Sequence, residues 1–229
     1  MSDILNDIWP ALRGGIWTTV SVTFLAAAWG TVVAVVFGVA SLSSNRVVRG
    51  FIRVYVEVLR GISVVILVFF VFFALPLFLD FVNYTLMQAA VLALGLNLSA
   101  YGTEIVRGAV QAVPRGQTEA AVAINLSTLR RIWSVTLPQA AIIILPPYGN
   151  LLIEVLKASA LVSFLGLSEI TNRAQNLRNQ AGSPDSALIF LTALIIYFVL
   201  SQGIAFGMRL LERRFGRGLE VGRMARTVK

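Results

Sequence analysis

The feature that most constrains the fold is a set of long apolar runs without a charged residue. The longest of them covers residues 16–42. A helix needs about twenty apolar residues to cross a bilayer, so this run alone is long enough to span one. Only 13% of the chain is charged, whereas soluble domains carry about 25%. The sequence therefore predicts an all-α membrane protein, and the lack of period-two alternation argues against a membrane barrel.

Five segments meet the length requirement for a membrane span. They are residues 16–42, 62–79, 85–106, 139–165 and 186–208. We expect one membrane domain over residues 1–229, with a polar and basic segment, residues 109–138, between the third and fourth spans. This loop is far longer than a simple connection between helices requires.

The distribution of Lys and Arg predicts the orientation of the chain. Most of these residues fall in segments 43–60, 107–137 and 209–229, which share one side of the membrane if there are five spans. Cytoplasmic loops carry an excess of Lys and Arg, so the N-terminus is expected outside and the C-terminus in the cytoplasm. This topology also accounts for the net charge of +8. We therefore do not expect nucleic acid as a partner.

The residue types that are absent exclude several kinds of chemistry. The sequence has no Cys and no His, so a thiolate nucleophile, a histidine base and a Cys/His metal site are excluded. Neither Lys157 nor Lys229 follows a glycine, so there is no Walker A motif. We expect no catalytic residue, no metal and no cofactor in this chain. If the protein uses ATP, another subunit hydrolyses it.

The long polar segment is expected to form two helices joined by a tight turn. Residues 117–124 and 126–135 contain good helix formers, and the second stretch has an apolar face at helical spacing. Between them lies Asn125, the residue type that best tolerates a positive φ after glycine. Such a short unit cannot bury its apolar face alone. Physical reasoning leaves open whether the unit rests on the bilayer or docks on a partner.

The spacing of this segment resembles a known motif. Glu119-Ala120-Ala121 is followed after three residues by Asn125, and after nine more by Val135-Thr136-Leu137-Pro138. This pattern resembles the EAA motif (EAA-x3-G-x9-I-x-L-P) of permease subunits in type I ABC importers, with Asn in place of Gly and Val in place of Ile. The resemblance implies that Glu119, Ala120, Ala121, Asn125, Leu137 and Pro138 couple the membrane helices to an ATPase subunit, which binds ATP and magnesium.

The resemblance extends over most of the chain. Residues 55–76, 100–121 and 151–167 are similar to polar amino-acid uptake permeases, but RGIS at 60–63 and KASAL at 157–161 depart from that pattern. The departures look most like the ectoine and hydroxyectoine branch. The resemblance therefore implies import of ectoine, with a polar or cationic amino acid as the alternative. A passive channel or membrane scaffold is the alternative from another class.

The same resemblance implies a set of partners and a location. The expected partners are a second, homologous permease subunit in a heterodimer, two ATPase subunits and an extracytoplasmic solute-binding protein. The expected location is the bacterial inner membrane.

Polar residues within the predicted spans are candidates for the solute path, because such residues are costly in a bilayer. Asn97, Tyr101 and Glu104 share one helical face, and Glu104 is spaced to pair with Arg107. Glu154 and Lys157 are three residues apart, so they either pair with each other or contact a zwitterionic solute. The candidates for the path or its gate are Asn97, Tyr101, Glu104, Glu154, Lys157 and Ser159.

Two further patterns concern helix geometry. Pro146-Pro147 is expected to break the fourth span, because proline removes a helical hydrogen bond. Gly203 and Gly207 form a GxxxG pattern that predicts close helix packing in the fifth span.

Overall fold

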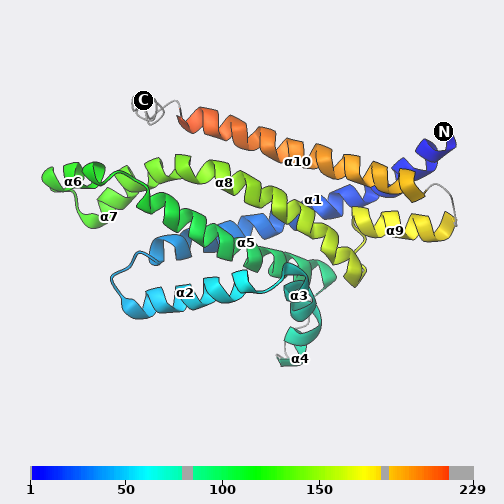
Figure 1. Ribbon diagram of the computed structural model, residues 1–229, viewed down its shortest axis with the longest axis horizontal. Coiled ribbons are helices and arrows are strands. Elements are labelled where there is room, and N and C mark those ends of the chain that lie inside the picture. The colour runs from blue at the N-terminus through cyan, green and yellow to red at the C-terminus, as the bar shows by residue number, and fades with distance from the viewer. Residues whose placement is uncertain (1, 79–84, 182–185, 217–229) are drawn as a thin grey trace.

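The structure, a computed structural model, describes residues 2–78, 85–181 and 186–216. Every regular element in these ranges is helical, which confirms the all-α prediction (Figure 1). The elements are α1 (Ser2–Ala40), α2 (Arg46–Gly61), α3 (Val64–Phe69), η1 (Phe70–Ala74), α4 (Leu75–Phe78), α5 (Leu86–Gln111), α6 (Arg115–Ala123), α7 (Thr128–Arg131), η2 (Ile132–Thr136), α8 (Leu137–Ala158), η3 (Ser159–Leu165), α9 (Ile170–Ala181) and α10 (Ser186–Gly216).

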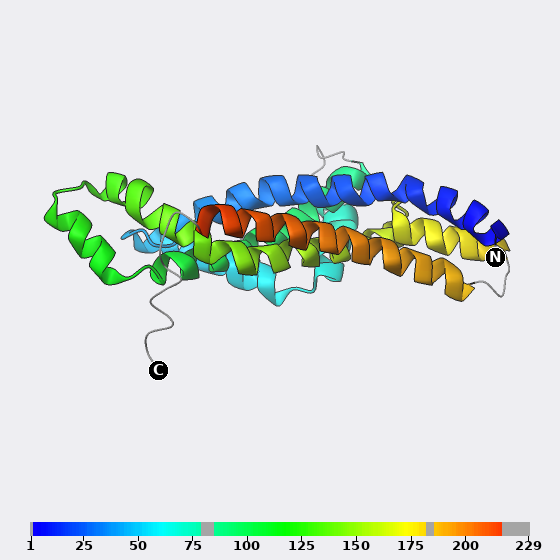
Figure 2. The ribbon, with the colours of Figure 1, turned by 90° about the horizontal axis from the view of Figure 1, so that it is seen from above.

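Four long apolar stretches run roughly alongside one another through the bundle. In the described part of the chain they cover Ile8–Ala40, Leu86–Gln111, Ile132–Leu165 and Ser186–Phe215, and each is long enough to cross a membrane. The first stretch starts before the expected residue 16, since α1 continues through Arg13. Figure 2 shows α6 and α7 projecting from one end of the bundle, with α9 and the start of α1 at the other end. This arrangement agrees with the expected order of loops.

The second predicted span has a different geometry from the one expected. Residues 46–61, expected as part of a loop, form the amphipathic helix α2. After Ile62, whose backbone is extended, α3 leaves at 104° to α2. Figure 1 shows α3 and α4 turned away from the other long helices. The span predicted at 62–79 stays a prediction: residues 64–78 are helical, but they meet the length requirement for a fifth span only together with α2. Residue 79 lies outside the described residues.

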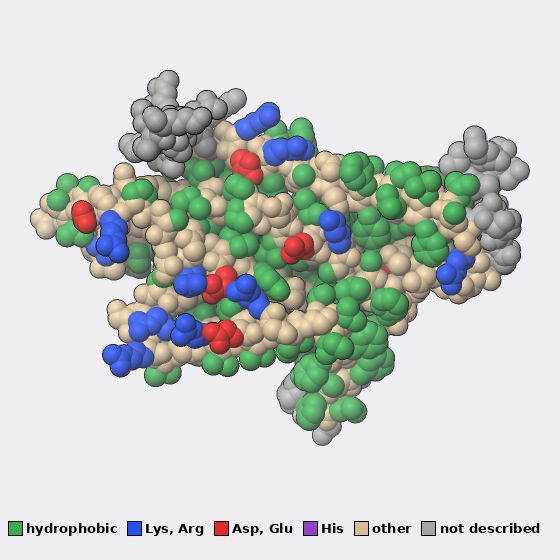
Figure 3. Space-filling view, viewed as in Figure 1, with side chains coloured by type: hydrophobic (Ala, Val, Ile, Leu, Met, Phe, Trp, Pro, Cys, Tyr) green, Lys and Arg blue, Asp and Glu red, His purple; other side chains and the backbone are tan. Residues whose placement is uncertain are grey.

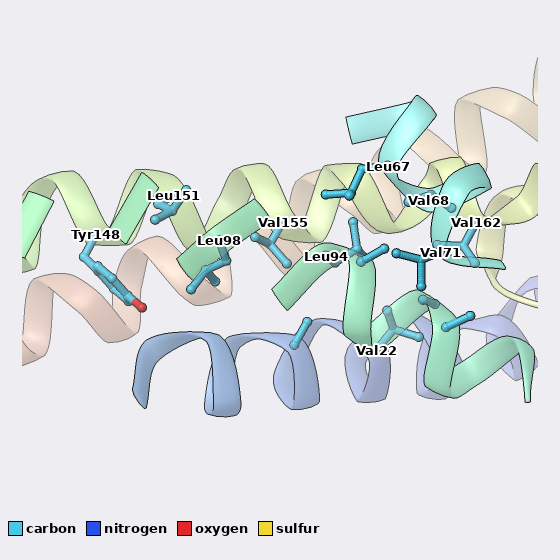
Figure 4. Close-up of a cluster of buried hydrophobic side chains, with 14 residues drawn as sticks. Val22, Leu67, Val68, Val71, Leu94, Leu98, Tyr148, Leu151, Val155 and Val162 are labelled. Atoms are coloured by element: carbon cyan, nitrogen blue, oxygen red, sulfur yellow. The ribbon is translucent and has the colours of Figure 1, made fainter. Parts of the chain in front are cut away.

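The main core lies where α1, α3, α5, α8 and η3 meet. Figure 4 shows Leu94 and Leu98 of α5 in the middle of this cluster, next to Val22 of α1 and Val155 of α8. A smaller core near α9 contains Ile170 together with residues of α1 and α10. Large apolar side chains on the outer surfaces of α1 and α10 remain exposed, as expected of helices that face lipid.

Small residues allow α1 and α5 to approach closely. Gly30, Ala34 and Gly38 repeat every fourth residue along α1 and face α5. A Cβ atom on Gly30 would lie 2.8 Å from the carbonyl oxygen of Gly95, and one on Gly38 would lie 2.5 Å from Val106. Small residues at this spacing drive helix association in membranes. The sequence reading missed this pattern and selected Gly203 and Gly207 instead, where an added Cβ would meet nothing within 4 Å.

This packing gives the first testable prediction. Gly95→Ala would place a Cβ 2.2 Å from the Trp29 indole, which also donates a hydrogen bond to the Val91 carbonyl oxygen. Overpacking typically costs about 1–3 kcal/mol, so we expect the yield of folded protein to fall by about tenfold in fluorescence-detected size-exclusion chromatography. Gly203→Ala is the matched control and should behave as wild type. Equal yields for the two variants would contradict the close packing.

The fourth predicted span (residues 139–165) lies in a continuous helical stretch, contrary to the expectation from the double proline. α8 runs from Leu137 to Ala158 with both prolines inside it. Buried residues on each side, Ala140 before the prolines and Tyr148 after them, anchor the helix to the bundle. Packing therefore offsets the backbone hydrogen bonds that proline removes. The predicted helix break at Pro146-Pro147 is wrong.

Candidate functional site

The segment between α5 and α8 forms the predicted helical hairpin, which we call the coupling hairpin (residues 115–136). Asn125 has a φ of 52° and is the one non-glycine residue with positive φ in the described chain. The backbone N–H of Leu126 donates to the Ala121 carbonyl at 3.0 Å, and that of Asn125 donates to Val122 at 2.9 Å. These two bonds define a Schellman motif that ends α6. The predicted left-handed turn at Asn125 is confirmed.

The coupling hairpin presents exposed apolar side chains, one at its turn and one near its base. Ile124 is 71% exposed and Trp133 is 67% exposed. Ala121 is buried, whereas Glu119 and Ala120 are exposed. At the base, the Gln139 side chain donates to the Gln117 side chain at 3.2 Å, which joins α6 to the start of α8. Near this base, Leu137 is partly buried and Pro138 is exposed. Exposed apolar side chains on a fixed base are suited to docking.

A pocket of about 470 Å³ lies at the bend between α2 and α3, and we call it the solute pocket. It combines three predicted path residues, Asn97 and Tyr101 of α5 and Glu154 of α8. The sequence reading did not select two further polar residues that line it, Arg60 and Ser63. Both stand at the bend, which no residue pattern in the sequence predicted.

The charges in the solute pocket are left available for a ligand. The Arg60 guanidinium carbon lies 5.1 Å above the Tyr101 ring, a cation–π contact that positions the cation without neutralising it. Glu154 is exposed and has no ion pair among the described residues. The pocket therefore offers one unpaired anion and one unpaired cation. This combination complements a zwitterion, whose carboxylate and ammonium carry opposite charges.

The other predicted path residues lie elsewhere. Glu104 forms the expected ion pair with Arg107 at 2.6 Å. The pair lines a different pocket, which lies closer to the coupling hairpin than the solute pocket does. Lys157 makes no described ion pair with Glu154 and lines a different pocket, between α8 and α10. Ser159 is buried and donates to the Leu156 carbonyl at 2.7 Å. On the face that Figure 3 shows, charged side chains are most numerous over α2, and others lie over α8 and α10.

A buried carboxyl group that sequence reasoning missed lies beyond the end of η3. Glu169 is 1% exposed. It accepts hydrogen bonds from the Tyr197 hydroxyl at 2.6 Å and from the Asn172 backbone N–H at 2.7 Å. Burial raises the pKa of the Glu169 carboxyl above its ordinary value, and these hydrogen bonds partly oppose that shift. The group joins α9 to α10 at the end of the bundle opposite the coupling hairpin.

The raised pKa predicts how pH affects stability. Stability from a carboxyl whose folded-state pKa is raised is fully present below the unfolded value of 4.5 and is lost as pH rises through the folded value. We expect Glu169→Gln to remove this dependence, because the amide oxygen still accepts from Tyr197. As the pH is raised from 5 to 8, the melting temperature of the wild type should fall by about 2–4 °C relative to that of the variant. Parallel melting curves would contradict the prediction.

Comparison with known proteins places the chain in a family. Residues 26–217 match the model of the binding-protein-dependent transport system inner membrane component. The probable amino-acid ABC transporter permease protein y4tF of Sinorhizobium fredii is 41% identical over 90% of this chain and 88% of that protein. The glutamine transport system permease protein GlnP of Escherichia coli is 33% identical over 91% of this chain and 96% of that protein.

Solved structures share the same architecture. The crystal structure of an amino acid ABC transporter with histidines superposes with a TM-score of 0.80 and 31% identity, over 90% of this chain and 94% of that chain. The MetNI methionine ABC transporter in an inward-facing conformation has a TM-score of 0.73 at 22% identity, over 89% of this chain and 95% of that chain, which indicates a shared fold.

Family membership brings a role and partners with it. Members are integral inner-membrane permeases without catalytic activity of their own, and they work with a separate ATPase subunit and a substrate-binding protein. The helical fold, the coupling hairpin and these matches agree, and the chain belongs to the binding-protein-dependent inner-membrane permeases of type I ABC importers.

Proposed function

We propose that this permease imports a zwitterionic amino acid by ATP-driven alternating access, with the solute pocket on the path. The observation that carries the proposal is that Arg60 and Glu154 line the same pocket and that neither forms an ion pair with a described residue. An α-amino acid carries a carboxylate, which can bind Arg60, and an ammonium group, which can bind Glu154. Asn97 and Ser63 add hydrogen-bonding groups for a polar side chain.

The relatives favour an amino acid over ectoine. Those named above are described as amino-acid or glutamine permeases, and the L-cystine permease TcyB of Bacillus subtilis is 32% identical over 93% of this chain. Ectoine is also zwitterionic, so the pocket alone does not separate the two solutes. We therefore infer amino-acid import and treat ectoine as a competitor to be tested.

We propose that the coupling loop, residues 109–138, docks on the ATPase subunit through the exposed tip of the coupling hairpin. Glu119 has no ion-pair partner among the described residues, so its charge is available to a partner. Its exposure and that of Ala120 support a direct contact. When two ATPase subunits close, they would pull on the coupling hairpin, and the hairpin would in turn move α8. A second, homologous permease subunit would complete the path, because one subunit with five spans is too small to enclose a path and its gates.

The proposed topology has the hairpin in the cytoplasm and α9 outside. Since the chain contains no Cys, single cysteines at Asn125 and Gln180 can report it. An impermeant thiol reagent added to intact cells is expected to label the variant at 180 and to leave the variant at 125 unlabelled. Disrupted cells, in which both sites should react, are the control. The opposite labelling pattern would invert the topology.

The import function is tested with the complete transporter in proteoliposomes. ATP is enclosed inside the liposomes, where the ATPase subunits face the lumen, and the cognate binding protein is added outside. A labelled polar amino acid should then accumulate inside. Ectoine is then added as an unlabelled competitor. If unlabelled ectoine abolishes the accumulation and unlabelled amino acids do not, ectoine is the favoured solute. If the labelled solute equilibrates across the membrane without ATP, a passive channel is favoured.

A further inference from the structure

A second pocket, of about 560 Å³, adjoins the solute pocket and shares Arg60 with it. We call it the arginine pocket. It lies between α2 and α5 and extends to Ser41 near the end of α1 and to Gln111 at the end of α5. In Figure 1, α2 begins toward the hairpin end of the bundle and ends at the bend to α3, where the solute pocket lies. The arginine pocket therefore continues the solute pocket toward the coupling hairpin.

The charges around the arginine pocket do not cancel. The cations that line it are Arg46, Arg49, Arg53, Arg60 and Arg107. The acidic residues are Glu57, which pairs with Arg53 at 3.3 Å, and Glu104, which pairs with Arg107. Arg49 donates only to a neutral group, the Ser43 carbonyl oxygen, at 2.7 Å. Arg46, Arg49 and Arg60 thus keep their charge uncompensated among the described residues.

An uncompensated cluster of one sign acts on any charged solute that passes. Clefts lined by like charges and bounded by low-dielectric walls concentrate counter-ions and repel ions of the same sign. Close to this pocket, α1 packs tightly against α5: a Cβ on Gly38 would lie 2.5 Å from the buried Val106 side chain. Arg60 lines both pockets, so a solute carboxylate held by Arg60 also borders the arginine pocket.

We propose that the arginine pocket is the cytoplasmic exit of the path and that its positive potential excludes cationic solutes. The inference rests on the proposed import function and narrows its substrate class. The transported amino acid carries a net charge of zero or below, like the zwitterions that the solute pocket fits. Lysine and arginine, with a net positive charge, are repelled by Arg46 and Arg49 at the exit.

The potential can be measured without any solute. Gln111→Cys puts the sole thiol of this chain in the arginine pocket, and Gln202→Cys puts one in the pocket between α8 and α10 as the control. In inverted membrane vesicles that contain the complete transporter, we compare the rates of an anionic and a cationic methanethiosulfonate. The anionic-to-cationic rate ratio at 111 is expected to exceed the ratio at 202 by about tenfold.

Arginine removal and salt then test the cause. Arg46→Gln with Arg49→Gln should lower the ratio at 111 several-fold and leave the ratio at 202 unchanged. High salt should lower it as well, because exposed charges are screened. A ratio at 111 equal to that at 202, or one that the double variant does not change, would overturn the proposal.

The solute prediction has its own readout. The complete wild-type transporter should accumulate labelled glutamine or glutamate faster than labelled lysine, and faster uptake of lysine would overturn the exclusion. The thiol measurement involves neither ATP nor the binding protein. An absent charge preference would therefore leave the proposed import function standing, whereas absent ATP-driven uptake would remove that function without altering the thiol ratio.

Discussion

Replacing Asn125 by proline is expected to abolish solute-stimulated ATP hydrolysis by the assembled transporter, with a loss of at least about tenfold. Proline fixes φ near −65°, whereas the turn holds Asn125 at 52°. Proline also removes the N–H that donates to the Val122 carbonyl. Both effects dismantle the turn between α6 and α7. The permease should still insert, because the turn lies outside the spanning stretches. Steady-state ATPase assays in proteoliposomes provide the measurement.

A graded series separates the turn from side-chain chemistry. Asn125→Gly keeps the left-handed conformation and should retain full stimulation. In Asn125→Ala the positive φ costs about 1–2 kcal/mol. Its stimulated ATP hydrolysis should therefore lie between those of the glycine and proline variants. Glu119→Arg, which reverses an exposed charge without altering the turn, should also uncouple hydrolysis. Full stimulation in the proline variant would show that the hairpin does not carry the coupling.

Removing either charge from the solute pocket is expected to lower ATP-driven uptake by more than about tenfold. Hydrogen bonds to charged groups contribute about 1.5–3 kcal/mol, which corresponds to tenfold or more in affinity. Arg60→Gln would remove the cation next to Tyr101, and Glu154→Gln would remove the anion on α8. The measurement is initial uptake of the labelled amino acid at several concentrations of loaded binding protein.

The control for these variants is Glu212→Gln. Glu212 is a partly buried carboxylate of α10 that lines neither the solute pocket nor the arginine pocket. Its neutral variant should transport as wild type and should stimulate ATP hydrolysis normally. Wild-type uptake by both pocket variants would exclude the solute pocket from the path.

The sequence predicted features that depend on local patterns. The left-handed turn at Asn125 follows from the residue type and its place between two helix-forming stretches. The Glu104–Arg107 pair follows from spacing on one helix. Long charge-free runs located the long helices. The first apolar stretch begins at Ile8 rather than at the expected residue 16, because a single charge near a helix end, here Arg13, does not stop the helix.

Features that depend on packing between distant segments were not predictable in this way. The 104° bend after Gly61 brings Arg60 to Tyr101, and no local signal specifies that angle. Glu154 and Lys157 share a face by spacing, yet they line different pockets on the two sides of α8. Gly30 and Gly38 face α5 because of how the bundle assembles, whereas a Cβ added at Gly203 or Gly207 of α10 would meet none of the described residues within 4 Å.

The unbroken course from η2 into α8 has a mechanical consequence. Residues 132–165 form one helical stretch despite Pro146 and Pro147. At about 1.5 Å per residue this rod is about 50 Å long. Because the helix is continuous from Trp133 to Lys157, a displacement at the hairpin end would be carried along it toward Glu154 and Lys157. If the hairpin docks on the ATPase subunit as proposed, pulling on it and reshaping the solute pocket would be one movement rather than a relay of separate events.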